Sequence, residues 1–155
     1  MILNRQRRVR IPVAELNRFL GVAQKHLRVP ADAITVALVT DAEMKKWNRA
    51  FRGKNRPTDV LSFPVDGPAK PKPKESRRAR PKSPSRGPAG PYLGDIAIAP
   101  AVARQNARRF GRTFSTEMRI LIVHGILHLL GYDHETDRGQ MDRREARERR
   151  ALGLL

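Results

Sequence analysis

Three of the chain's four histidines fall within eleven residues, in the stretch HGILHLLGYDH at positions 124–134. His124 and His128 are four residues apart, so on a helix both imidazoles would project from one face, with Cβ atoms about 5–6 Å apart. Gly131 offers the positive-φ conformation at which helices commonly end, and His134 follows three residues later. Three converging imidazoles are the usual protein ligands of a catalytic zinc ion. The spacing therefore predicts one Zn²⁺ per chain, held by His124, His128 and His134.

A second interpretation of the first two histidines stays open. Two histidines at this spacing on an apolar helix are often core or half-exposed side chains rather than ligands. The third histidine, the intervening glycine and the scarcity of histidine elsewhere favour the metal site. The remaining one, His26, falls in an early polar helix and is interpreted as a surface residue. Because the chain has no cysteine, histidines and carboxylates are its only strong metal ligands.

The order His-x3-His-x2-Gly-x2-His is also the ligand spacing of the extended zinc motif of metzincin proteases. In those proteins a Glu, the general base, follows the first histidine, whereas this chain has Gly125 there. Glycine cannot accept a proton, so the pattern keeps the metal ligands and loses the base of peptide hydrolysis. Glycine also costs a helix interior roughly 1 kcal/mol relative to Ala. We therefore expect a compensating reason, such as the close approach of a strand or a substrate.

The elements that would position these histidines are predicted from hydrophobic periodicity and capping residues. An apolar run predicts a buried helix over residues 115–130 that carries the first two histidines. Strands are expected at about 2–11 (an edge strand), 34–40, 59–65 and 94–99, and further helices at about 13–27, 41–49, 100–110 and 137–150. Four strands and about five helices in irregular alternation predict an α+β domain with a small four-stranded mixed sheet.

Length, charge and composition limit the classes of protein to which the chain can belong. A length of 155 residues predicts one domain over 1–155, and 32 Lys and Arg against 15 Asp and Glu give a net charge of +17. So basic a surface attracts polyanions, and with only eight aromatic residues the contacts should be mainly to phosphates and sensitive to salt. The N-terminus has no apolar signal region, and the apolar run at 120–130 is too short for a membrane span. We expect a soluble cytoplasmic protein.

Two basic segments admit two interpretations each. The loop FRGKNRPT brings Arg52, Lys54 and Arg56 together, either as solvated charges or as a phosphate clamp at the start of a strand. Residues 66–92 contain seven prolines, three glycines and eight basic against two acidic residues, which predicts a disordered or extended basic loop. This insertion could add nonspecific RNA affinity or be a tolerated segment that adds solubility.

Four motifs together resemble the YbeY family of bacterial endoribonucleases and rRNA maturation factors. They are FRGKNRPTDVLSFP, LGDIAIAP, HGILHLLGYDH, and Met141 with Glu145, and they follow the family's order across residues 34–150. The resemblance implies a zinc-dependent, single-strand-specific endoribonuclease that acts in 3′-end maturation of small-subunit rRNA and in ribosome quality control. It also implies that His124, His128 and His134 bind zinc and that Arg52 is the functional arginine beside the active site. Residues 66–92 are longer and more basic than the family's usual link.

The implied partners are single-stranded RNA, the small-subunit rRNA precursor and the ribosomal small subunit, with no DNA and no membrane expected. A bound zinc ion would lower the pKa of its water towards about 7 and polarise a phosphoryl oxygen, and Arg52 could neutralise a second oxygen. Asp59 and Asp133 are candidate bases, although Asp59 could equally be a structural cap and Asp133 could orient a ligand. Two other classes remain open: a non-catalytic RNA-binding ribosome assembly factor with a structural zinc, and a metallohydrolase of another substrate such as a peptide.

Overall fold

The computed structural model describes residues 1–65 and 92–154, and within them four strands and five helices confirm the α+β prediction. The strands are β1 (Ile2–Asn4), β2 (Ile34–Leu38), β3 (Val60–Pro64) and β4 (Gly94–Ile98), and the helices are α1 (Val13–His26), α2 (Asp41–Arg52), α4 (Pro100–Arg109), α5 (Phe114–Leu129) and α6 (Gln140–Ala151). The predicted basic insertion at 66–92 lies outside the described residues apart from Tyr92. None of the helices in the described ranges is long and apolar enough to cross a bilayer.

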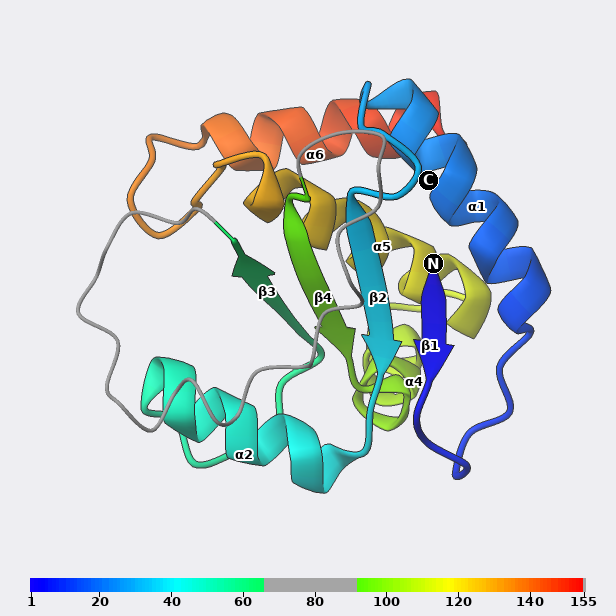
Figure 1. Ribbon diagram of the computed structural model, residues 1–155, viewed down its shortest axis with the longest axis vertical. Helices are drawn as coiled ribbons and strands as arrows, with labels where there is room; N and C mark the ends of the chain where they lie inside the picture. Colours follow the sequence, from blue (N-terminus) through cyan, green and yellow to red (C-terminus); the bar gives the residue numbers. More distant parts are fainter. Residues whose placement is uncertain (66–91, 155) are drawn as a thin grey trace.

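The sheet is mixed and has the order β1-β2-β4-β3. Strands β1, β2 and β4 run parallel to one another, and β3 pairs antiparallel to β4. Strand β3 therefore lies at one edge and β1 at the opposite edge (Figure 1). The apolar, β-branched sequences of β2 and β4 suit the centre of the sheet, where every residue of both strands is buried.

Helices cover both faces of the sheet, and each face has its own apolar cluster. On one face the large side chains of β2 and β4 pack against α1, α5 and α6. On the other face Met44 and Trp47 of α2 pack against β3, where the Trp47 and Phe63 rings meet edge to face. The histidine helix α5 thus lies against the sheet on the larger side of the core (Figure 1).

Local signals fix both ends of α5. The hydroxyl of Thr113 accepts a hydrogen bond from the backbone N–H of Thr116 at 3.1 Å, which caps the first turn. At the other end Gly131 has a φ of 99°, so the chain leaves the helix there and turns back, as the sequence predicts. The helix spans Phe114–Leu129, one residue earlier at each end than predicted.

Several predicted elements have different bounds, and two of these differences have a clear local cause. The edge strand expected at 2–11 ends at Asn4, because the Gln6 side chain bonds both the N–H and the carbonyl of Val9 and so replaces the ladder. The helix expected at 41–49 continues to Arg52. It ends only where Gly53 adopts a φ of 68°, so Arg52 lies on the last turn of α2 rather than in the loop.

Candidate metal centre

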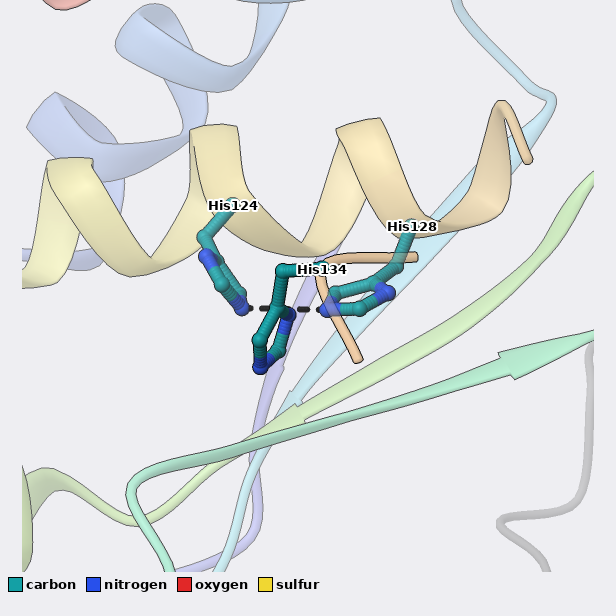
Figure 2. A group of neighbouring side chains, drawn as sticks. All are labelled: His124, His128 and His134. Carbon is teal, nitrogen blue, oxygen red and sulfur yellow. Dashed lines mark hydrogen bonds between the residues drawn. The ribbon is translucent and has the colours of Figure 1, made fainter. Parts of the chain in front are cut away.

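The three predicted ligands converge at one point. Figure 2 shows the rings of His124 and His128 projecting from one side of α5, with His134 reaching the same place from the segment that follows the helix. One nitrogen from each ring lies within 4.8 Å of the other two, and Nε2 of His124 is 3.1 Å from Nε2 of His128. Two nitrogens of a tetrahedral zinc site are about 3.3 Å apart. The residues therefore fit a metal ion with three imidazole ligands.

A buried carboxylate holds the first ligand in the orientation that metal binding needs. Oε2 of Glu145 on α6 lies 3.1 Å from Nδ1 of His124, so Nδ1–H donates to the carboxylate and Nε2 presents its lone pair. Burial alone would raise the pKa of Glu145, but the hydrogen bonds and charges of His124 and Arg149 outweigh it and lower the pKa. Arg149 holds the other carboxylate oxygen at 2.5 Å. Glu145 therefore stays ionised and fixes the His124 ring.

The second ligand is neutral at ordinary pH. Burial, and then the charges of His124 and His134, lower the pKa of His128 from 6.5 to about 4, although Asp133 and a hydrogen bond to the Tyr132 backbone act in the opposite direction. An unprotonated imidazole can bind a metal ion without first losing a proton. His128 is therefore ready to act as a ligand near neutral pH.

Strand β4 approaches α5 closely at Gly125, which is one of the two reasons expected for a glycine in this helix. A Cβ at this position would lie 2.7 Å from Cγ2 and 2.8 Å from Cδ1 of Ile96 on β4. Its carbonyl oxygen accepts a hydrogen bond from the Ser62 hydroxyl of β3 at 3.2 Å. The position that carries the general base in metzincins is thus buried against Ile96 here and has no room for a side chain.

The histidines lie in a cleft of about 780 Å³ between α5 and strand β3. Arg52 lines the same cleft and forms an ion pair with Glu135 of the turn after α5. Both side chains are exposed, at 36% for Arg52 and 55% for Glu135, so the pair contributes at most about 1 kcal/mol to stability. A substrate anion can therefore compete with Glu135 for the guanidinium.

The two candidate bases have structural partners. Asp59 accepts hydrogen bonds from the N–H of Val60 at 2.8 Å, from the Thr58 hydroxyl at 3.3 Å and from the Asn106 amide at 3.0 Å. This geometry favours the capping role for Asp59. Asp133 accepts from the N–H of Glu135 at 3.0 Å, which shapes the turn that carries His134.

Sequence reasoning missed the partners of the site residues. Glu145 lies one turn after Met141 on the same face of α6, and both are buried, but its bond to His124 was not predicted. The pairing of Arg52 with Glu135 was missed as well. The only sequence signal was a Glu on the apolar side of an otherwise charged helix, which indicates a buried partner. His26 is exposed as predicted, yet it pairs with Glu148 at 2.5 Å.

A mixed sheet with three convergent histidines on a buried helix and its following turn defines an α+β protein with a candidate metal centre. Comparison with known proteins identifies the family. The family model described as Endoribonuclease YbeY matches residues 2–153, and the chain belongs to this family.

Individual relatives carry the name of the same family. A protein of Solibacter usitatus named Endoribonuclease YbeY is 42% identical over 139 residues, which are 90% of this chain and 78% of the relative. A protein of Koribacter versatilis with the same name is 35% identical across 99% of this chain and 86% of its own length. The solution structure of a Thermotoga maritima protein is similar with a TM-score of 0.55 and 28% identity, covering 98% of this chain and 89% of that one.

Proposed function

We propose that the protein is a zinc-dependent, single-strand-specific endoribonuclease of the cytoplasm that acts in 3′-end maturation of small-subunit rRNA and in ribosome quality control. The observation that carries the proposal is the convergence of His124, His128 and His134 inside a cleft that also contains Arg52, in a chain of the YbeY family. Its partners are single-stranded RNA, namely the rRNA precursor, and the ribosomal small subunit. The net charge of +17 supports a polyanionic substrate.

Each site residue has a defined task in this reaction. A zinc ion held by the histidines would supply Lewis-acid chemistry to a phosphodiester and make a water molecule more acidic. Glu145 keeps the Nδ1 proton on His124 and leaves Nε2 free for the metal. Arg52, released from Glu135 by the incoming phosphate, binds a non-bridging oxygen as negative charge develops there. The cleft between α5 and β3 receives an unpaired strand.

One rival function has a specific observation in its favour. Position 125 cannot carry a base, because Ile96 occupies the space that a side chain would need. If no other group accepts the proton, the protein binds RNA as a non-catalytic ribosome assembly factor with a structural zinc. The peptide-hydrolase alternative has only the metzincin-like ligand spacing in its favour, and the same packing at position 125 counts against it.

Cleavage of a single-stranded rRNA 3′-end precursor distinguishes the two functions. Wild type, His128→Ala and His26→Ala are purified side by side, because the fourth histidine is exposed and lies outside the cleft. We expect cleavage by wild type and His26→Ala and none by His128→Ala, together with a lower zinc content and melting temperature for His128→Ala. Equal cleavage by all three would reveal a contaminating nuclease. Binding without cleavage would favour the assembly factor.

A further inference from the structure

Phe110 is a large apolar side chain in an unusual place. It follows α4 directly, its residue is 54% exposed, and it lines the cleft that contains the histidines. The described residues contain four other large hydrophobic residues with comparable exposure, Met1, Leu3, Val22 and Leu130, and none of these lines the cleft. An aromatic ring kept in water at the wall of a cleft is a candidate contact for a ligand.

Two arginines flank this ring, and they differ in how they are held. The guanidinium carbon of Arg112 lies 5.0 Å from the ring centroid, and Arg112 is fixed by an ion pair of 2.8 Å with the buried carboxylate of Glu117. The guanidinium carbon of Arg109 lies 5.5 Å from the same centroid. Arg109 is exposed and has no ion pair among the residues that the structure describes. Arg112 therefore braces the ring, whereas Arg109 can move to another anion.

The ring and the metal centre are connected along one face of α5. Glu117, Leu121, His124 and His128 recur at helical spacing, and all of them line the cleft. His124 comes ten residues after Phe114, a rise of about 15 Å along the helix. Phe110 and Arg112, just before the helix, thus lie at one end of the cleft and the histidines towards the other. A rise of about 15 Å along the helix corresponds to a few nucleotides of an extended strand.

We propose that Phe110 is a base-stacking platform that binds one unpaired nucleobase of single-stranded RNA, a few nucleotides away from the phosphodiester at the histidines. The base lies on the exposed ring, Arg112 supports the ring, and Arg109 turns to the adjoining phosphate. Aromatic rings stack on any base, and arginine adds a cation–π contribution and a phosphate contact. The inference deepens the proposed function and rests on it for the class of substrate.

The flanking charges decide the kind of ligand. Three arginines lie at this end of α4 and in the loop after it, namely Arg108, Arg109 and Arg112. The nearby carboxylates are already engaged, Glu117 by Arg112 and Asp59 by the amide of Asn106. A ligand that combines a flat apolar group with negative charge suits this surface, and an unpaired nucleotide has both. A base within a duplex has its faces covered by its neighbours. The platform therefore also provides a physical basis for preferring single strands.

The test measures binding of a short labelled single-stranded RNA by the full chain in EDTA, which prevents metal-dependent cleavage. The RNA is prepared as a series in which one nucleotide at a time is abasic. The protein variants are Phe110→Ala, Phe110→Leu, which keeps the apolar character without the ring, and Phe110→Tyr, which keeps the ring. Val22→Ala removes an equally exposed apolar side chain on α1, away from the cleft, and is the matched control.

We expect wild type to lose affinity by roughly 10-fold when one particular nucleotide is abasic. Phe110→Ala and Phe110→Leu should bind the intact RNA about as weakly as wild type binds that abasic RNA, with no further loss at that position. Phe110→Tyr and Val22→Ala should behave as wild type. Equal affinity of wild type and Phe110→Ala, or an abasic effect that persists in Phe110→Ala, would overturn the platform.

Cleavage of the intact RNA by the zinc-loaded proteins separates this inference from the proposed function. Phe110→Ala should raise KM with little change in kcat, because the ring lies away from the reacting bond. Cleavage by wild type combined with unchanged binding by Phe110→Ala would refute the platform alone. A position-specific abasic effect without any cleavage would refute the nuclease and leave the platform as part of an RNA-binding site. A wild type that binds no RNA would refute both.

Discussion

Arg52 is the charged side chain that we propose binds the reacting phosphate. It lies on the last turn of α2 and lines the cleft beside the metal centre. Its contact with Glu135 is an exposed ion pair, so removing it should leave the fold and the metal ligands in place. If Arg52 binds the reacting phosphate, its removal should therefore lower the rate of cleavage and leave the zinc content unchanged.

Arg52→Ala should lower kcat by roughly 100-fold with zinc retained, because one group that stabilises the developing charge is lost. Arg56→Ala is the matched control, since it removes the same charge four residues later without touching the cleft. Cleavage assays and elemental analysis of the same preparations measure both quantities. Loss of zinc from Arg52→Ala would show a structural role, and an equal loss of activity in Arg56→Ala would point to net charge alone.

We expect Glu145 to control the affinity for a metal ion through its contact with His124. Glu145→Gln keeps the size of the side chain and removes its charge, so the Nδ1–H of His124 is held less firmly and zinc affinity should fall by roughly 10- to 100-fold. Glu148→Gln changes the same chemical group three residues later on α6, where the carboxylate contacts His26 and Arg144 instead. Competition with a chelator should leave the zinc affinity of Glu148→Gln at the wild-type value. Equal affinities for both variants and wild type would contradict the role of Glu145.

His128 gives the metal-free protein a defined response to acid. Its pKa is about 4 in the folded state against 6.5 in the unfolded chain, so the unfolded state takes up this proton first as the pH falls. The contribution of His128 to stability is therefore largest above pH 6.5 and is lost as the pH falls towards 4. As the pH falls from neutral to about 4.5 in EDTA, the free energy of unfolding should decrease less for His128→Gln than for wild type. Urea unfolding of both proteins at several pH values measures these free energies. The same pH dependence in both proteins would contradict the prediction.

At the scale of elements, α5 and β4 are packed too closely for a side chain at position 125. Gly125→Ala would place a Cβ 2.7 Å from the Cγ2 methyl group of Ile96. Ile96 is β-branched and fully buried, so it has little room to adjust, and the variant should be destabilised by about 1–3 kcal/mol. Gly21→Ala on α1 has open space and should stabilise it by about 0.4–1 kcal/mol. In thermal unfolding the penalties of Gly125→Ala and Ile96→Ala should be less than additive. Full additivity would show that the two side chains do not compete for space.

Local sequence signals predicted most of the elements and the convergence of the three histidines at the candidate metal centre. The convergence of the histidines could be predicted because the helical spacing and the helix end at Gly131 are both determined within a few residues. The largest error was at 2–11, where the Gln6 side chain ends the strand. Two helix ends were also misplaced, at Arg52, where the helix continues until Gly53, and at Gln140, where the last helix begins. The contact between Glu145 and His124 joins residues that are 21 positions apart. Such a contact depends on how α6 packs on α5, and no local pattern encodes it.

At the scale of the whole molecule, charge should dominate the affinity for RNA. Binding of a single strand should weaken by roughly 10- to 100-fold between about 50 mM and 200 mM salt, because each neutralised phosphate releases counterions. Segment 66–92, with its eight basic residues, could add RNA affinity or only solubility. Replacing these residues distinguishes the two interpretations. Replacing them with Ser should flatten the salt dependence if they contact RNA. An unchanged slope would support a segment that adds only solubility.

The three metal ligands are not held equally. His124 and His128 belong to a helix packed into the core, whereas His134 is exposed on the turn that follows. All three ligand nitrogens already lie within 4.8 Å of one another, and His134 is the most exposed of the three histidines. Because a turn opens far more often than a core helix unfolds, the ion can leave when His134 swings out while α5 stays intact. We therefore expect the exchange rate of a bound metal ion to depend on this turn, with no unfolding of the protein required.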